Sequence, residues 1–432
     1  MKLRAIVPAL SILLGCAVNV HAVSLTLQGE SAGLASASSE ALYASDSSGK
    51  SVLVTEVGLP SPDGGDFSEV GVPSMMPDGR VLFGAETTAK DGKTHWAIFI
   101  GDPDRTPVFR VTRAIDLKPT EDCSPTLKGD PYPVADADGD IAFMARIGEK
   151  SDALVMYSQG TLTCLARTGS KTAQGHDIAV LSFGSPEMGQ SGQVIFNAWL
   201  NSPPAHDAKS SSADGPDPAH RHRQALLIAS RVGGINEIAA EGDYGPNHTR
   251  YAQPFGLPAA LASAQGTLVA FTAKTESGAA LFLYRDGEMA RILPTGTLTP
   301  EGPVTYLSPG RPGLMSDGTT AVLAGVARVP AVFRLSHQRL DLRLQRGQLT
   351  PFGTELESLG DPVLTADGTM FIGATDSEDN EKLYELGGDG AFFEVGAQDP
   401  IYKISTATHR HSIFTGTLTV NQHGDFAYLG GK

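Results

Sequence analysis

Short apolar segments alternate with turn residues along most of the chain, and one phrase of this kind occurs seven times. Its clearest copy is Pro73 to Ala85, PSMMPDGRVLFGA. The other copies lie at Pro133 to Ala145, Pro186 to Ala198, around Gly266, Pro312 to Ala324, Pro362 to Ala374 and Leu418 to Gly430. In each copy an Asp-Gly or related turn separates a short strand from an apolar strand, because Gly accepts the positive φ of a tight hairpin turn. The phrase therefore predicts a β-hairpin.

A second hairpin follows several of these phrases, as at 153–165, 280–293 and 382–395. The glycines of successive phrases are 60, 53, 74, 52, 50 and 56 residues apart, and the longest interval contains a polar insertion at 201–223. Four antiparallel strands per unit of about 50 residues are typical of the blades of a β-propeller.

The two ends of this pattern are complementary halves of one unit. Residues 41–55 form a second hairpin without a first, and Leu418 to Gly430 form a first hairpin without a second. Pairing the two would remove the exposed strand edges of a linear array. We therefore predict an all-β fold, a seven-bladed β-propeller of four-stranded antiparallel blades closed by its N- and C-terminal hairpins. It forms a single domain, 41–432, after a flexible segment, 23–40.

The phrases resemble the exported bacterial tandem repeats of the form N-x-x-G-x-x-A-F and, more distantly, the WD-like repeats of periplasmic propellers. Asn421 and Gly424 match this form, whereas Phe426 and Ala427 reverse the A-F order. Most other copies carry Asp, Ser or Ala where the family has Asn. The resemblance implies a propeller-like exported protein of undefined activity, and it brings no catalytic residues with it.

Residues 1–22 have the pattern of a signal peptide. Lys2 and Arg4 precede an apolar stretch, and the small residue Ala22 suits signal peptidase cleavage. The sequence Leu13-Leu14-Gly15-Cys16 also resembles a bacterial lipobox, so lipidation at Cys16 stays open as the alternative. No other stretch approaches the roughly 20 apolar residues of a membrane-spanning helix. We expect an exported protein without a transmembrane segment, periplasmic or extracellular, or else an outer-membrane lipoprotein.

Net charge limits the kinds of partner that the protein can bind, and the cysteine content predicts a disulfide. The chain has 33 Lys and Arg against 48 Asp and Glu, a net charge of -15, and no basic cluster. Nucleic acid is therefore not an expected partner, because phosphate neutralisation needs clustered cations. Without Cys16, an exported chain keeps Cys123 and Cys164, for which we predict a disulfide. Two unpaired buried thiols are the alternative.

The longer connections between blades are expected on one rim, and they carry the candidate binding residues. These residues are Asp63, Asp122, Asp243, His248, Asp399, His409 and His411. Loops on a rigid scaffold commonly carry function. Asp136-Ala-Asp138-Gly-Asp140 resembles part of a calcium loop but lacks the later acidic ligands, so a hairpin turn is the favoured interpretation. We predict no metal site and no cofactor; calcium has no support beyond this fragment.

No nucleophile elbow, phosphate loop, zinc-protease helix or Cys-x-x-Cys pair occurs in the sequence. The leading hypothesis is a noncatalytic, monomeric propeller that binds a protein or glycan partner through its long-loop rim. The alternative is a hydrolase or lyase acting on a polysaccharide or ester, with carboxylates and histidines gathered at the axial funnel. Close approach of three or more candidate residues at the axis would favour the enzyme.

Overall fold

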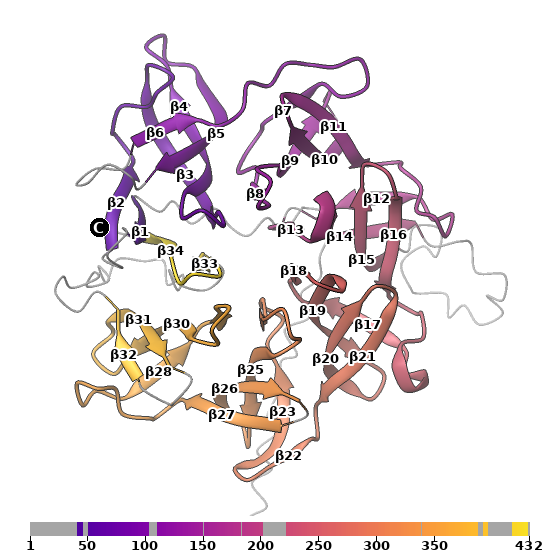
Figure 1. Cartoon of the computed structure of the whole chain (residues 1–432), viewed down its shortest axis with the longest axis vertical. Helices are drawn as coiled ribbons and strands as arrows, with labels where there is room; N and C mark the ends of the chain where they lie inside the picture. The colour runs from indigo at the N-terminus through magenta and orange to yellow at the C-terminus, as the bar shows by residue number, and fades with distance from the viewer. Residues whose placement is uncertain are drawn as a thin grey trace, which may run out of the picture. The chain divides into compact units, whose positions relative to one another are not determined.

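Seven antiparallel sheets surround a common centre, and the predicted seven-bladed β-propeller is confirmed (Figure 1). The computed structural model describes residues 41–45, 51–102, 110–149, 151–182, 184–201, 222–337, 339–387, 392–395 and 417–430. The chain divides into two units, Met1–Ala32 and Gly33–Lys432, and every described residue lies in the second. The predicted signal peptide, Cys16 and the segment 23–40 lie outside the described residues.

The first three blades follow one another along the chain, each running from its innermost to its outermost strand. Blade 1 contains β3 (Asp66–Met75), β4 (Val81–Thr88), β5 (Thr94–Asp102) and β6 (Arg110–Arg113). Blade 2 contains β7 (Pro125–Thr126), β8 (Val134–Ala135), β9 (Ile141–Ile147), β10 (Ser151–Ser158) and β11 (Thr161–Arg167). Blade 3 contains β12 (Ile178–Leu181), β13 (Glu187–Met188), the 3-10 turn η1 (Gln190–Gly192), β14 (Val194–Asn201), β15 (His222–Ser230) and β16 (Gly234–Ala240).

The next three blades repeat this order. Blade 4 follows the 3-10 turn η3 (Pro246–His248) and contains β17 (Tyr251–Phe255), β18 (Ala259–Ser263), β19 (Gly266–Thr275), β20 (Gly278–Arg285) and β21 (Glu288–Pro294). Blade 5 contains β22 (Leu298–Thr299), β23 (Gly302–Leu307), β24 (Gly313–Leu314), β25 (Thr320–Val326), β26 (Val329–Ser336) and β27 (Arg339–Gln345). Blade 6 contains β28 (Leu356–Leu359), β29 (Val363–Leu364), β30 (Met370–Asp376), β31 (Glu381–Leu386) and β32 (Phe392–Glu394).

Blade 7 joins both ends of the described chain. It contains β33 (Thr419–Val420), β34 (Phe426–Gly430), β1 (Ala41–Ser45) and β2 (Ser51–Glu56). Strands β1 and β34 pair antiparallel, with Leu42 opposite Leu429. The rings of Tyr43 and Tyr428 stack 5.6 Å apart across this seam. The predicted closure by N- and C-terminal hairpins is therefore confirmed.

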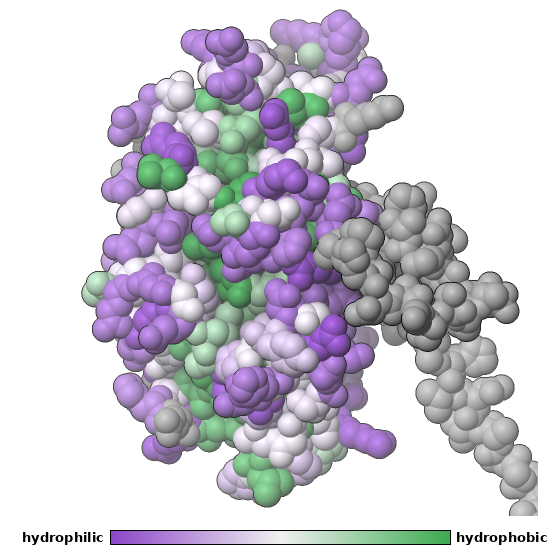
Figure 2. All heavy atoms as spheres, turned by 90° about the vertical axis from the view of Figure 1, so that its right-hand side faces the viewer, coloured by the Kyte–Doolittle hydropathy of each residue, from purple (hydrophilic) through white to green (hydrophobic). Residues whose placement is uncertain are grey.

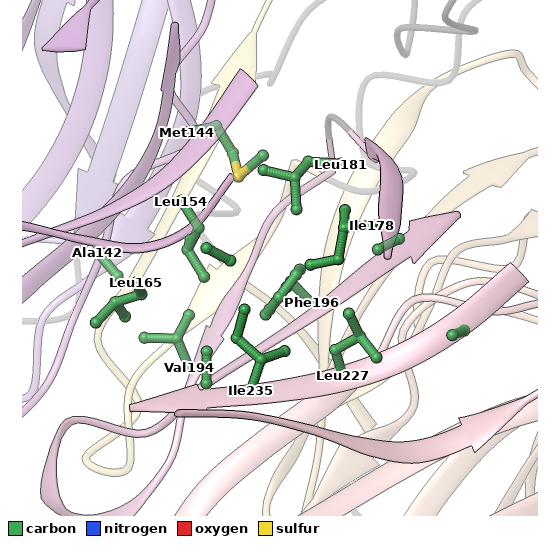
Figure 3. Packing of buried hydrophobic residues seen from close by; sticks show 14 of the residues in the cluster. Ala142, Met144, Leu154, Leu165, Ile178, Leu181, Val194, Phe196, Leu227 and Ile235 are labelled. Atoms are coloured by element: carbon green, nitrogen blue, oxygen red, sulfur yellow. The ribbon is translucent and has the colours of Figure 1, made fainter. Parts of the chain in front are cut away.

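The apolar runs of the second strands are explained by burial on both faces of each sheet. In β9, Phe143 packs in the core shared with blade 1, while its neighbour Met144 packs in the core shared with blade 3. Figure 3 shows Met144 and Leu154 of blade 2 close to Phe196 and Leu181 of blade 3. Because successive residues of a strand point to opposite faces, a run of four or five apolar residues fills two interblade cores at once.

The innermost strand of blades 2 to 6 is interrupted, so two short strands pair with the same neighbour. Of these segments, β8, β13 and β18 lie near the centre, as does β33 (Figure 1). We call one side of the ring the hairpin rim. It carries the hairpins between first and second strands and between third and fourth strands. We call the opposite side the connection rim, and it carries the turns between second and third strands and the connections between blades. The polar insertion 201–223 joins β14 to β15 and belongs to the connection rim; its residues 202–221 lie outside the described part.

Candidate functional site

The four described candidate residues are distributed over three blade junctions of the connection rim. Asp63 lies between blades 7 and 1, where its Oδ2 is 3.4 Å from Nη1 of Arg113 and 3.6 Å from Nε2 of His95. Asp122 is exposed between blades 1 and 2. Asp243 and His248 share the connection between blades 3 and 4. Asp399, His409 and His411 lie outside the described residues.

Asp243 belongs to a polar network that sequence reasoning did not find. Its Oδ1 accepts a hydrogen bond of 2.9 Å from Arg223, whose Nη2 lies 3.0 Å from Oε2 of Glu237. The other oxygen of Glu237 accepts from Thr172 at 2.6 Å and lies 2.6 Å from Nδ1 of His176. The network ties the connection between blades 2 and 3 to the outermost strand of blade 3. Both oxygens of Glu237 are used inside the protein, so the cluster supports the scaffold.

Five blade junctions share one backbone arrangement. In each, a glycine with φ between 85° and 89° begins the connection. Its N–H donates to a carbonyl in the innermost strand of the next blade. The five bonds are Gly58 to Phe67, Gly169 to Ile178, Gly242 to Tyr251, Gly296 to Val304 and Gly347 to Leu356. Only glycine adopts this φ without steric cost. These connections are thus held in fixed positions by the backbone.

Large apolar side chains are exposed on these connections. Leu298 is 82% exposed, Tyr244 71%, Phe352 61% and Leu349 59%. Three of them, Tyr244, Leu298 and Leu349, occupy the same place, two residues after the junction glycine. Figure 2 shows that hydrophilic residues cover much of the side that it faces, with apolar residues between them. Of the four, Phe352 has a contact within the chain, because Nζ of Lys382 lies 5.3 Å from the centroid of its ring.

The exposed apolar residues are distributed unequally between the two rims. The described part of the chain has eleven exposed large apolar residues, and seven of them lie in the connections between blades or beside a turn between second and third strands. The seven are Val57, Leu59, Tyr244, Leu298, Val329, Leu349 and Phe352. Of the other four, Val180 and Tyr306 lie within innermost strands, Phe393 lies within an outermost strand, and Val232 lies in a hairpin of the opposite rim.

A cavity of about 290 Å³ lies on the axis, lined by the innermost segments of all seven blades. It occupies the half of the axis toward the hairpin rim, since hairpin residues such as Ser316, Ala366 and Gln422 line it. Most lining residues are small or apolar, and the only charged ones are Glu187 and Arg311. Arg311 Nη2 is 2.7 Å from Oε1 of Glu187. None of the four described candidate residues lines this cavity.

Two buried carboxylates join neighbouring blades close to the cavity. Asp130 accepts hydrogen bonds from the backbone N–H groups of Val72, at 2.7 Å, and of Tyr132, at 3.0 Å. Asp361 accepts from the N–H of Arg311 at 3.1 Å and from Oγ of Ser308 at 3.2 Å. Both carboxylates link the innermost strand of one blade to that of the next, at equivalent positions of the ring.

Each of these carboxylates lies so close to a glycine that no side chain would fit there. A Cβ at Gly71 would overlap Asp130, and a Cβ at Gly310 would overlap Asp361. The two glycines belong to a Gly-x-Pro tripeptide present at this place in five blades. The tripeptides begin at Gly71, Gly184, Gly256, Gly310 and Gly360. The proline of the repeated phrase was visible in the sequence, but the carboxylate partners of the glycines were not.

Burial raises the pKa of three carboxyl groups around the axis. Desolvation raises the pKa of Asp130 to about 7, against the lowering effect of its two backbone donors. Desolvation also raises the pKa of Glu187, opposed by the charge of Arg311, and that of Asp361, opposed by the backbone N–H of Arg311. The interior near the axis therefore disfavours unpaired negative charge.

Cys123, in the connection between blades 1 and 2, forms a disulfide with Cys164 of β11. In the part of the chain that the structure covers, no group of three or more His, Cys, Asp or Glu side chains is placed to hold a metal ion. Asp136 accepts hydrogen bonds at 3.0 Å from the backbone N–H groups of Asp138 and Asp140, within a hairpin turn. Among the same residues, no helix is long and apolar enough to cross a membrane.

Comparison with known proteins gives one family and several distant structures. A protein family described as a family of unknown function (DUF7453) matches residues 110–431. A search of curated proteins finds no match. A sialidase from Trypanosoma rangeli aligns with a TM-score of 0.36 and 9% identity, over 76% of this chain and 55% of its own. Prolyl oligopeptidase B from Galerina marginata aligns with a TM-score of 0.43 and 10% identity, over 76% of this chain and 44% of its own. A lectin from Aleuria aurantia, in complex with α-methyl-L-fucoside, aligns with a TM-score of 0.35 and 9% identity, over 75% of this chain and 94% of its own. The chain thus spans about half the length of the first two proteins.

Proposed function

The chain belongs to the DUF7453 family, and we propose that it is an exported, noncatalytic β-propeller that binds a partner protein through its connection rim. The observation that carries this proposal is the one-sided distribution of exposed apolar side chains. Seven of the eleven in the described residues lie on that rim, and one, Val232, lies on the hairpin rim. These residues lie at four different blade junctions and in one turn, so a partner that contacts several of them must extend over neighbouring blades.

The fixed backbone of the connections supports this function. The glycine bonds described above hold Tyr244, Leu298 and Leu349 at equivalent places on three successive junctions. A surface that is already ordered loses little conformational entropy when a partner binds. Aromatic residues such as Tyr244 and Phe352 are also enriched in protein interfaces.

Charge favours one kind of partner over another. The connections carry more acidic than basic residues, and the whole chain has a net charge of -15. Anionic polysaccharides and anionic lipid surfaces are repelled by such a field, whereas a protein with basic and apolar residues is attracted. A neutral glycan is the second partner class, and it is treated as an outcome of the test.

A catalytic role does not enter the proposal. The described candidate acids and histidine occupy three separate junctions, and Asp63 and Asp243 already pair with Arg113 and Arg223. No observation on the described residues specifically favours a hydrolase or lyase.

The test uses photo-crosslinking residues placed at single positions of the full chain, in cells that produce it. Probes at Leu298 and Leu349 examine the connection rim, and a probe at Val232 examines the hairpin rim. We expect one discrete protein adduct from the two rim positions and none from Val232. Serine at Tyr244 and Phe352 should reduce the adduct formed at Leu298, whereas Val232→Ser should not. Equal adducts from both rims, or none, would contradict the proposal.

A neutral glycan array probed with the same purified variants distinguishes the second partner class. Glycan binding that is lost with the serine variants, without a protein adduct, would replace a protein partner by a glycan. Export is tested separately by the intact mass of the protein from its native cells. A chain that begins after Ala22, or one lipidated at Cys16, supports export, and an unprocessed chain contradicts it.

A further inference from the structure

The axial cavity is a second surface of different character, far along the axis from the apolar side chains of the connection rim. All seven blades contribute to it, and it contains one acid and one base, Glu187 and Arg311. The pair spans blade 4, because Glu187 belongs to blade 3 and Arg311 to blade 5. The cavity is therefore neutral as a whole but strongly polar at one place.

The other blades have neither a glutamate nor an arginine at the corresponding positions. Six blades have a proline in the innermost strand, and the residue after it lines the cavity. That residue is Ser74, Val134, Glu187, Ala259, Gly313 and Val363 in blades 1 to 6. Five blades thus present a small or aliphatic, uncharged residue to the cavity where blade 3 presents a glutamate. Among the same blades, only blade 5 has a basic residue immediately before the proline, Arg311.

Part of the Arg311 guanidinium has no hydrogen-bond partner in the described protein. Its Nη2 contacts Glu187, and its unpartnered Nε is shielded from solvent, so a ligand in the cavity reaches the guanidinium from the Nη side. A guanidinium presents its N–H groups as a planar fork that matches a carboxylate. The backbone of Arg311 is held in place by Asp361. Its side chain is 28% exposed and that of Glu187 17%, so both can be reached from the cavity.

We propose that this cavity binds a small zwitterion of the free amino-acid class. The ligand carboxylate replaces Glu187 on the Nη groups of Arg311, and the ligand ammonium binds the carboxylate of Glu187. A ligand with both charges replaces one internal ion pair by two, so no buried charge is left alone. A simple anion or cation would leave Glu187 or Arg311 unpaired, which is costly in a desolvated site. The volume of about 290 Å³ is at the lower end of ligand pockets, which restricts the ligand to a small molecule.

The experiment is isothermal titration of the full-length protein with glycine and L-alanine, each raised to about 10 mM. Acetate, ethylamine and glucose serve as ligands that carry one charge or none. We expect saturable binding of at least one amino acid, and binding at least about tenfold weaker for the other three compounds. Equal binding of acetate or glucose, or no binding of either amino acid, would overturn the proposal.

Variants locate the binding in the cavity. Arg311→Gln should abolish binding, and Glu187→Gln should weaken it about tenfold. The matched control is Arg285→Gln, because Arg285 also has a buried Nε without a partner but does not line the cavity. Arg311→Lys keeps the charge without the fork and should weaken binding, so the proposal stays testable if Arg311→Gln does not fold. Unchanged affinity in folded Arg311 variants would contradict it.

The serine variants of the connection rim should bind the amino acid as the unaltered protein does. Failure of this inference is thus separable from failure of partner binding at the rim.

Discussion

The connection rim and the axial interior use polar and apolar groups in opposite ways. On the rim, apolar side chains such as Leu298 are held in water by backbone hydrogen bonds and have no packing role in the described chain. Around the axis, the carboxylates of Asp130 and Asp361 are taken out of water to bind the backbone of a neighbouring blade. The difference separates groups that build the ring from groups available to a partner. Changes to these buried carboxylates should alter stability, and changes to the exposed apolar side chains of the rim should alter binding.

The largest effect is expected where a rim connection is tied covalently to its blade. Replacing both Cys123 and Cys164 by Ser removes a crosslink between residues 41 apart in sequence. The lost constraint on the unfolded chain should lower the free energy of unfolding by about 4 kcal/mol. Urea unfolding of the double variant, compared with the unaltered protein with and without reductant, measures this. An unchanged midpoint would show that the connection is held without the bridge.

A somewhat smaller loss is expected from closing the gap between two blades. Gly310→Ala places a Cβ where the carboxylate of Asp361 lies. The carboxylate must then move away from the backbone N–H of Arg311, from which it accepts a hydrogen bond. The free energy of unfolding should fall by about 3 kcal/mol. Gly184→Ala is the matched control, because the same position in blade 3 meets only Leu257 Cδ2, at 3.6 Å. Equal losses in both variants would show that the contact of Asp361 with the backbone of Arg311 does not explain the loss.

The pH dependence of stability should show the contribution of Asp130. Its pKa is raised to about 7 in the folded protein and lies near 4 in an unfolded chain. Between these values the folded state binds more protons than the unfolded state, so stability should fall as pH rises from about 4 to about 7. Asp130→Asn should remove most of this fall. Thermal unfolding across that pH range measures the slope, and Asp138→Asn, at an exposed turn, should leave it unaltered.

The smallest effect on stability is expected on the connection rim. Leu298→Ser changes a side chain that is 82% exposed, and the free energy of unfolding should change by less than about 0.5 kcal/mol. The same variant should lose photo-crosslinked adducts formed at Leu349. A large loss of stability would mean that Leu298 packs within the protein, and the contrast between rim and interior would no longer hold.

The fold could be predicted from the sequence because its signals are local and repeated. Turns such as Asp78-Gly79 and the apolar strands after them specify hairpins one at a time. The closing blade followed from counting unmatched hairpins at the two ends. The candidate site could be predicted only in part. The order of the strands tells on which rim a residue lies, but it does not tell which side chain the residue pairs with. Asp63 and Asp243 lie on the expected rim, yet Arg113 and Arg223 already pair with them.

The cavity pair was missed for a different reason. Glu187 and Arg311 are far apart in sequence and share no local motif, since blade geometry alone brings them within 2.7 Å. Aligning the repeated phrases on their proline would have shown that Glu187 is the only charged residue directly after it and Arg311 the only basic residue directly before it, in blades 1 to 6. The exposed positions on the connections could not be recognised either, because no feature of the sequence separates an exposed leucine such as Leu298 from a buried one such as Leu307.

The seam of blade 7 makes the order of assembly asymmetric. Strand β1 lies near one end of the described chain, and its partner β34 lies near the other, with Ala44 opposite Ala427. During synthesis, β1 must wait with an unpaired edge until β34 has emerged, and pairings so distant in sequence form slowly. A chain that stops before β34 would carry that open edge permanently, and open edges recruit other chains. Closure of the ring therefore depends on synthesis through β34, the partner of β1.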